Sequence, residues 1–307
     1  MRTFVKFVGI AALIVIAAII LLGRLLKSSG TASMVPADYT EKVETGGDIE
    51  AKYLAFGGYE IARVTGNFPE GSPETWGSYT IYYPQELENG ADKYPVVVSV
   101  NGTGVSASRY EALLEHLASW GFIVLGNEDP DTHTGSSADA TLSILLTLNE
   151  DPSSVFYQKA DVDHIGIFGH SQGGVAVFNA ISGQSHSTMY RCAVALSPSD
   201  EENSAKQGRP YDASKAAIPI MVLAGTELDA ISLENMQAMY ESIRAPRLFA
   251  RKTGMGHSQM LYSADGYVTA WFMWHLQNDE IAAAAFTDHI GEIRNNPLYQ
   301  DVRSALE

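Results

Sequence analysis

The chain has 307 residues, of which 46% are hydrophobic and 18% charged, and its formal net charge is −16. That length and composition are ordinary for a globular protein and fit one large α/β domain better than two small ones. Nucleic-acid recognition relies on clustered Lys and Arg, so a chain this acidic disfavours it and no nucleic-acid partner is expected.

The N-terminus carries a long apolar segment. The 16 residues Phe7–Leu22 are apolar or glycine and uncharged, and the run approaches the length of a membrane-spanning helix if it continues past Arg24. We therefore predict a transmembrane anchor over 1–27, with the folded domain on the extracytoplasmic side. The alternative is a signal peptide cleaved after the small residues at 30–32, which would give a secreted protein. Arg24 and Lys27 lie between the apolar run and that site, and this favours the anchor.

Residues 28–52 are mostly small and polar and are predicted to be a linker, which leaves 53–307 as one domain. Apolar runs in that domain predict strands over 79–84, 94–100, 121–127, 164–169, 192–197, 218–225 and 247–252. Amphipathic stretches between them predict helices over 108–120, 138–150, 172–182, 232–243 and 264–277. This alternation is typical of an α/β fold with a mostly parallel sheet and helices on both faces. In such sheets, ligands bind at the carboxyl ends of the strands.

Glycines follow the strand predicted at 94–100. The run Gly102, Thr103, Gly104 exposes backbone N–H groups at that strand end. An acyl-transfer site needs two such donors for its tetrahedral oxyanion, and Thr103 is the favoured one of the three. The alternative is an ordinary glycine turn.

The stretch IGIFGHSQGGV (165–175) places Ser171 between a buried strand and a helix, with Gly169 and Gly173 on either side. A reversal this tight strains the serine backbone and needs neighbours without side chains, and it presents the hydroxyl as a nucleophile. The amide of Gln172 is then the second predicted oxyanion donor. A phosphate-binding loop would instead show G-x-G-x-x-G or end in G-K-[ST], and neither is present here.

An acidic residue follows the strand predicted at 218–225. Asp229 comes four residues after that strand and is the predicted catalytic acid. Glu227 is the near alternative and Asp200, after the preceding strand, the distant one. Acids in a turn before a helix often serve only as caps.

A histidine follows the strand predicted at 247–252. His257 lies in the glycine-flanked loop KTGMGHSQM, from which it can reach back over the sheet edge. His133 is the other loop histidine, but it precedes the serine, and His170 is expected to point away from Ser171 and pack. The order Ser171, Asp229, His257 is that of α/β-hydrolases, with the histidine as general base and acid and the aspartate holding its tautomer.

These pieces together resemble a known superfamily, the serine α/β-hydrolases, and within it the chlorophyllase and cutinase-like polyester-hydrolase branch. The resemblance covers roughly residues 90–280 and rests on the segments YPVVVSVNGTG, YEALLEHLASWGFIVLGNED, IGIFGHSQGGVAVFNA, VLAGTELDAIS, GMGHSQM and VTAWFMWHLQND. It implies an α/β-hydrolase fold and an esterase or lipase-like activity. It also implies Asp229 as the acid, the amides of Thr103 and Gln172 as the oxyanion donors, and no cofactor or metal.

Two positions depart from that branch. Polyester hydrolases of the branch tend to carry an aromatic residue in the oxyanion loop, where this chain has Thr103, and a tryptophan after the strand before the acid, where it reads LSPSDEE. These departures favour plain carboxylic esters over polyesters as substrates. The segment between the strands at 192–197 and 218–225 is also too short for a helical lid, so we expect an open cleft.

We therefore predict a membrane-anchored serine carboxylesterase acting on a small-molecule or lipid-like ester. Three alternatives remain open: a peptidase, amidase or thioesterase using the same triad; an acyltransferase; and an inactive hydrolase-like binding ectodomain.

Overall fold

The computed structural model describes residues 33–287 and 290–306. The predicted anchor over 1–27 lies outside the described residues. Within the part that is described, no helix is both long and apolar enough to cross a membrane. The chain divides into two compact units, Met1–Met34 and Val35–Glu307, and the helices and strands named below lie in the second.

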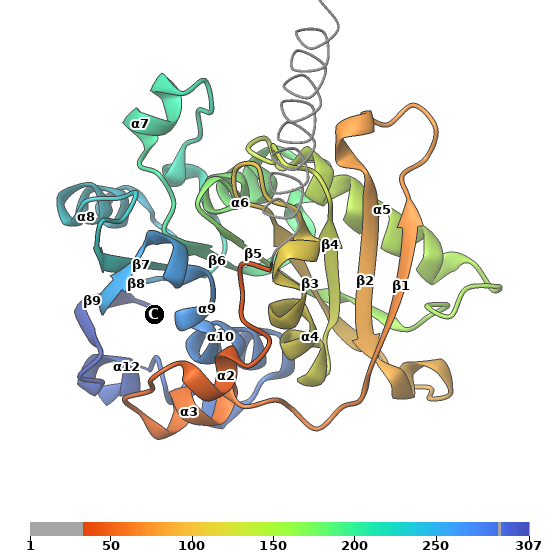
Figure 1. The fold of residues 1–307 in the computed structure, drawn as a ribbon, viewed down its shortest axis with the longest axis horizontal. Helices are drawn as coiled ribbons and strands as arrows, with labels where there is room; N and C mark the ends of the chain where they lie inside the picture. The colour runs from red at the N-terminus through yellow and green to blue at the C-terminus, as the bar shows by residue number, and fades with distance from the viewer. Residues whose placement is uncertain (1–32, 288–289, 307) are drawn as a thin grey trace, which may run out of the picture. The chain divides into compact units, whose positions relative to one another are not determined.

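A nine-stranded sheet forms the centre of this unit, in the order β1-β2-β4-β3-β5-β6-β7-β8-β9 (Figure 1). The pairs β1–β2, β2–β4 and β8–β9 are antiparallel, and the other five are parallel. The strands are β1 (Ile61–Asn67), β2 (Ser78–Pro84), β3 (Tyr94–Val100), β4 (Ile123–Asn127), β5 (Ala160–His170), β6 (Tyr190–Leu196), β7 (Ile220–Glu227), β8 (Arg247–Gly256) and β9 (Tyr299–Ala305). The predicted mostly parallel α/β sheet is confirmed.

Helices cover both faces of the sheet, as predicted. On one face α4 contacts β2 and β4, and α10 contacts β5 and β6; on the other, α5 and α6 lie over β3 to β6 and α8 lies against β8. The long helices are α4 (Glu111–Ser119), α5 (Ser136–Glu150), α6 (Gln172–Gly183), α8 (Leu233–Ser242) and α10 (Asp265–Gln277). The short ones are α2 (Tyr39–Lys42), α3 (Asp48–Leu54), α7 (Glu201–Lys206), α9 (Met260–Ser263), α11 (Glu280–Ala283) and α12 (Glu292–Asn295).

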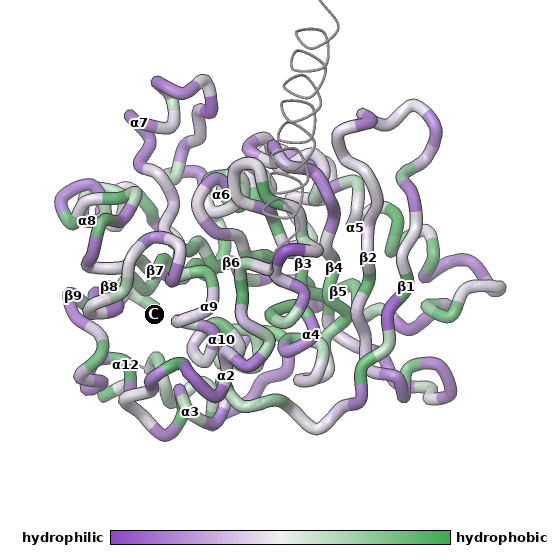
Figure 2. Tube along the Cα trace, viewed as in Figure 1, coloured by the Kyte–Doolittle hydropathy of each residue, from purple (hydrophilic) through white to green (hydrophobic). Residues whose placement is uncertain are grey.

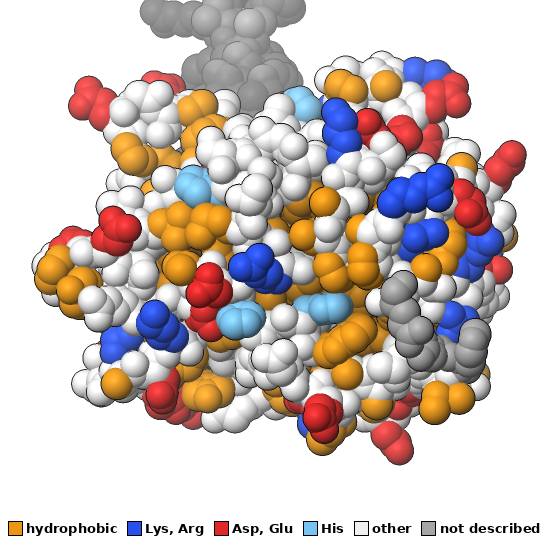
Figure 3. All heavy atoms as spheres, turned by 180° about the vertical axis from the view of Figure 1, so that it is seen from behind, with side chains coloured by type: hydrophobic (Ala, Val, Ile, Leu, Met, Phe, Trp, Pro, Cys, Tyr) orange, Lys and Arg blue, Asp and Glu red, His pale blue; other side chains and the backbone are white. Residues whose placement is uncertain are grey.

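The apolar runs in the sequence become strands that are buried from both sides. Val96, Val97 and Val98 of β3 are fully buried, because helices cover the two faces of the sheet at this point. Figure 2 shows the hydrophobic colour along the central strands and the hydrophilic colour in the peripheral loops. The surface is different, since basic and acidic side chains are interspersed on the face seen in Figure 3. The core therefore fixes the central strands whose ends carry the predicted site.

The segment 28–52 was predicted to be a linker, but helix α2 lies within it and helix α3 begins within it. Helix α3 packs against α10, and the side chains of Tyr39 and Glu50 are buried. Glu50 pairs with the buried Lys252 of β8 at 2.8 Å. The segment looked like a linker because its contacts are polar and made with distant residues, so no apolar period marks it.

The edge strands β1 and β9 were also not predicted. Both are partly exposed and carry several polar residues, so neither shows the continuous apolar run of a central strand. Between β6 and β7 the chain forms only α7 and the 3₁₀ turn Ala213–Lys215. No helical lid therefore arises from this segment, as expected.

Candidate active site

Ser171 lies at the sharp turn between β5 and α6. Its backbone angles are φ 59° and ψ −121°, a region that residues with a side chain rarely adopt. Its N–H donates to the carbonyl oxygen of Leu196 on β6 at 2.9 Å. The strained turn is thus held to the neighbouring strand, and it presents the serine side chain at the carboxyl end of β5.

The two elbow glycines allow the strand and the helix to approach. A Cβ added at Gly169 would lie 2.3 Å from the carbonyl oxygen of Gly173, and one added at Gly173 would lie 2.1 Å from that of Val100 on β3. Neither atom can move, because both belong to backbone at the centre of the fold. A side chain at either position would therefore clash with backbone atoms.

Gly173→Ala is expected to destabilise the protein by about 3 kcal/mol or more, because the methyl group forces apart α6 and the end of β3. Gly183→Ala is the matched control in the same helix, since a Cβ there meets nothing within 4 Å. The control should be neutral or stabilising by up to about 1 kcal/mol. Urea unfolding of both variants measures the difference. Equal stability of the two would contradict the close approach at the elbow.

Three side chains from three strand ends meet at this turn. His257 begins directly after β8, and its Nε2 lies 3.0 Å from Ser171 Oγ. Its Nδ1 lies 3.3 Å from Asp229 Oδ1, after β7. The chain of contacts fixes the neutral tautomer: Nδ1–H donates to Asp229, and the lone pair of Nε2 accepts from the serine hydroxyl. The predicted Ser171, His257 and Asp229 side chains are therefore brought together.

The carboxylate of Asp229 is buried but well supplied with donors. Its Oδ2 accepts from Ser197 Oγ at 2.7 Å and from the N–H of Gly225, and its Oδ1 accepts from the N–H of Ala230 at 2.6 Å. Burial alone would raise the pKa of Asp229, but the hydrogen bonds from His257 and these three donors outweigh it and lower the pKa below its usual value. The aspartate is therefore ionised and rigidly held.

The rival residues have other positions. Glu227 is exposed at the end of β7, and Asp200 caps α7 by accepting from the N–H of Asn203 at 2.9 Å. His133 lies 3.1 Å from Asp131 in the loop after β4. None of the three contacts His257 or Ser171 in the described hydrogen bonds.

His170 packs against His257 and makes no hydrogen bond with Ser171 in the described contacts. Its ring lies 4.7 Å from the ring of His257, and its Nε2–H donates to the backbone carbonyl oxygen of His257 at 2.7 Å. Burial, and then repulsion by His257 in its protonated form, lower the pKa of His170 to about 4. The neutral imidazole thus holds the backbone of the loop that carries the predicted base.

This depressed pKa predicts a loss of stability in acid. The unfolded chain takes up a proton at His170 near pH 6.5 and the folded chain only near pH 4, so the unfolding free energy falls as the pH drops through that window, by about 3 kcal/mol from this residue. His170→Gln keeps an N–H donor and cannot titrate. Between pH 7 and pH 4 the variant should lose about 3 kcal/mol less than the wild type in urea titrations. Parallel losses would contradict the assignment.

The glycine loop after β3 lies against the elbow. A Cβ added at Gly102 would lie 3.8 Å from the Cβ of Ser171, which places this loop beside the nucleophile. The buried Asn101 anchors the loop by donating to the carbonyl oxygens of Asn127 and Asp129 at 2.7 and 2.8 Å. Thr103 follows at the exposed tip of the turn. The predicted oxyanion loop and the nucleophile are therefore neighbours.

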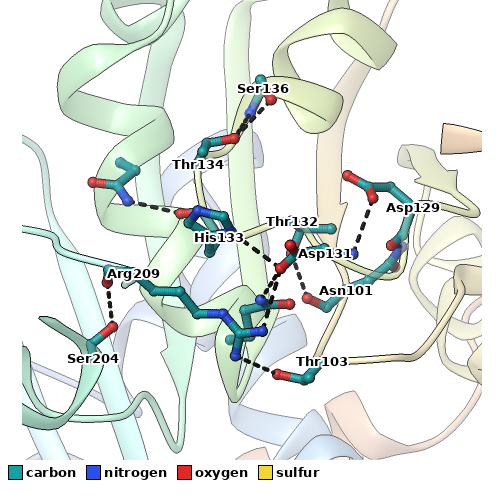
Figure 4. A network of polar contacts seen from close by, with 12 residues as sticks. Asn101, Thr103, Asp129, Asp131, Thr132, His133, Thr134, Ser136, Ser204 and Arg209 are labelled. Atoms are coloured by element: carbon teal, nitrogen blue, oxygen red, sulfur yellow. Dashed lines mark hydrogen bonds and ion pairs between the residues drawn. The ribbon is translucent and has the colours of Figure 1, made fainter. Parts of the chain in front are cut away.

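Two further residues at this edge were missed in the sequence, namely Asp131 after β4 and Arg209 between β6 and β7. Arg209 contacts Thr103 and Asp131, and Asp131 accepts a hydrogen bond from Gln172 (Figure 4). Asp131 could have been found, because it follows a predicted strand and so lies at the same sheet edge. Arg209 had no signal, because it lies in an irregular segment far from any strand end.

No cluster of three or more His, Cys, Asp or Glu that could hold a metal ion occurs among the residues the structure describes. The chain was also compared with known proteins. A protein-family model described as PET hydrolase-like matches residues 49–286, which is more than half of the chain. A search of curated proteins gave no match.

Proposed function

The chain belongs to the PET hydrolase-like family of α/β-hydrolases and is a carboxylic ester hydrolase, and we propose that it cleaves esters with Ser171 as the nucleophile, His257 as the general base and acid, and Asp229 as the orienting acid. The observation that carries the proposal is the pair of contacts from His257, 3.0 Å to Ser171 Oγ and 3.3 Å to Asp229 Oδ1. The first is a distance over which a proton moves directly from a nucleophile to its base, and the second is a hydrogen bond that orients the base.

The reaction follows from this geometry in two halves. His257 Nε2 takes the hydroxyl proton as Ser171 Oγ bonds to the ester carbonyl carbon, and Asp229 stabilises the imidazolium that forms. The imidazolium then gives its proton to the alcohol oxygen as the ester C–O bond breaks, which leaves an acyl-enzyme. Water repeats the sequence with the same base, and the acid product leaves with Ser171 restored.

The negative charge that develops on the carbonyl oxygen needs two donors. We assign them to the backbone N–H groups of Thr103 and Gln172. Gln172 is the first residue of α6, so its amide lies at a helix N-terminus, where negative charge is favoured. The loop of Thr103 approaches the nucleophile through Gly102. The proximity of these two elements supports the assignment.

The side chains around the proposed nucleophile affect which class of ester the site favours. Thr103 and the segment 196–202, where the branch tends to carry aromatic residues, make polar contacts here: Thr103 with Arg209, Ser197 with Asp229, and Asp200 with α7. Leu228, beside the predicted acid, is 97% exposed and has a φ of 47°. The site thus offers an apolar contact but no aromatic pair at those two positions, and we propose aliphatic esters, including aliphatic polyester chains, as the favoured substrates.

A panel of esters tests this proposal. We expect p-nitrophenyl butyrate and an aliphatic polyester to be hydrolysed, and an aromatic polyester film to be attacked at least about 5-fold more slowly, since a stacking contact is worth about 1 kcal/mol or more. The matching p-nitroanilide and thioester separate the esterase from amidase and thioesterase activities. Ser171→Ala serves as the blank. A preference for the aromatic film, or for the anilide, would contradict the substrate assignment.

We further propose that residues 1–27 hold the enzyme in a membrane with the esterase domain outside the cytoplasm. The support for the span is the uncharged run Phe7–Leu22, and the proposed orientation places Arg2 and Lys6 on the cytoplasmic side. Fractionation of cells that produce the full chain, followed by the intact mass of the product, tests this. Retention in the membrane at full mass supports the anchor, and a shortened soluble product shows the cleaved alternative.

A further inference from the structure

The two residues whose amides are the proposed oxyanion donors share one set of side-chain contacts. Arg209 Nη1–H donates to Thr103 Oγ1 at 3.2 Å, and Gln172 Nε2–H donates to Asp131 Oδ1 at 2.5 Å. Arg209 Nη2 lies 3.5 Å from that same carboxylate oxygen. One ion pair therefore links the side chains of both donor residues, and Figure 4 shows the part of this link that runs from Asp131 through Arg209 to Thr103. Neither Arg209 nor Asp131 is needed for the proton transfers of the triad.

The backbone of Arg209 is fixed at one end of this link. Its N–H donates to the carbonyl oxygen of Ser204 at 2.9 Å, and its own carbonyl oxygen accepts from Ser204 Oγ at 2.5 Å. Helix α7, which carries Ser204, is itself capped by Asp200. The guanidinium therefore extends over the oxyanion loop from a defined base, with about a quarter of the side chain exposed.

The Asp131 end of this link is fixed as well. The N–H of Asp131 donates to Asp129 Oδ1 at 3.0 Å, and its Oδ1 also lies 3.1 Å from Nδ1 of His133. The carbonyl oxygen of Pro130 accepts from the N–H of Gly104 at 2.8 Å. The loop after β4 thus holds the oxyanion loop on one side of Thr103. Arg209 reaches Thr103 from a different segment of the chain.

We propose that Arg209 and Asp131 form a brace that positions Thr103 and Gln172, so that their N–H groups point to the same oxyanion. Both are positioning residues, because they act through the donor residues and not on the ester. The inference rests on the proposed function. A guanidinium suits the role because its planar fork reaches two acceptors at once, which the single ammonium of lysine does not do in the same geometry.

The brace should matter for the transition state and little for the bound ester. An oxyanion hole stabilises the tetrahedral oxygen only when its donors are already in place, and loss of one donor costs about 10²- to 10³-fold in kcat. Arg209→Gln loosens the position of a donor without removing it, so we expect kcat for p-nitrophenyl butyrate to fall about 10-fold. KM should stay within about twofold.

A tetrahedral inhibitor gives a second readout that a merely structural role would not move. A trifluoromethyl ketone forms a hemiketal oxyanion at the serine, so its inhibition constant should rise in Arg209→Gln by the same factor as kcat/KM falls.

Further variants test whether the two residues act together. Arg209→Lys should recover less than half of the kcat that Arg209→Gln loses. Asp131→Asn should also lower kcat, and the double variant with Arg209→Gln should be no slower than the slower single one, because both changes break one brace.

Lys206→Gln is the matched control. Lys206 lies three residues before Arg209 and pairs only with the exposed Glu202 in the described contacts. Its substitution by Gln removes one positive charge, as Arg209→Gln does. Its kcat should equal that of the wild type, and all variants should unfold at the same urea concentration.

Three results would overturn the brace: unchanged kcat in Arg209→Gln, a change in KM alone, or an additive double variant. If the wild type itself lacks esterase activity, the proposed function fails, whereas an active wild type with an unaffected Arg209→Gln refutes the brace alone.

Discussion

Asp229→Asn is expected to lower kcat by about 10⁴-fold. The aspartate accepts from Nδ1–H of His257 and is fixed by the N–H groups of Gly225 and Ala230 and the hydroxyl of Ser197. An amide nitrogen in place of one carboxylate oxygen cannot accept from these donors. It favours the imidazole tautomer that carries its proton on Nε2, which cannot take the proton of Ser171. Initial rates with p-nitrophenyl butyrate measure the loss.

Glu227→Gln is the control for that variant. Glu227 lies two residues before Asp229, the proposed catalytic acid, carries the same charge and is exposed at the end of β7. We expect its kcat to remain within about twofold of the wild type, because a screened surface charge perturbs the site weakly. If Glu227→Gln proves the slower of the two variants, the identity of the orienting acid is wrong.

Lys252→Met is expected to reduce the free energy of unfolding by about 3 to 5 kcal/mol. Lys252 Nζ donates to Glu50 Oε1 at 2.8 Å and to the carbonyl oxygen of Ser263 at 2.5 Å, and the exposed fractions of the two charged side chains are 3% and 1%. Burial lowers the pKa of Lys252, and the charge of Glu50 counters part of that effect. Removing the lysine leaves a buried carboxylate without its cation.

Urea unfolding compares this variant with two others. Lys252→Met combined with Glu50→Gln should recover part of the loss, because no buried charge is then left unpaired. Lys42→Gln removes an exposed cation paired with Asp38 and should change the stability by less than about 1 kcal/mol. If Lys252→Met behaves like Lys42→Gln, the buried ion pair does not hold α3 against β8.

The meeting of the three residues of the proposed triad could be predicted because each of them belongs to a local pattern at a strand end. Ser171 is marked by its glycines, and Asp229 and His257 follow apolar runs that read as buried strands. Parallel strands bring their carboxyl ends to one edge, so residues far apart in the sequence could be expected to meet. The structure was still needed to choose between Asp229 and Glu227 as the acid, because only Asp229 contacts His257 in the described hydrogen bonds.

Other parts of the molecule depend on pairs of distant residues and leave no local pattern. Helix α3 is held by the contact of Glu50 with Lys252, which lies 202 positions further along the chain. The contact of Thr103 with Arg209 spans 106 positions, and either residue alone looks like an ordinary surface residue. Polar contacts of this kind appear only once the strands have been placed in order.

The most direct test of the central assignment is active-site labelling with a fluorophosphonate, followed by mass spectrometry of the digested protein. The account predicts a single adduct, on Ser171, in the wild type. It predicts no adduct in Ser171→Ala and labelling slower by about 10³-fold or more in His257→Ala, because the serine then lacks its base. An adduct on another residue, or full labelling without His257, would contradict the assignment of Ser171 as the activated nucleophile.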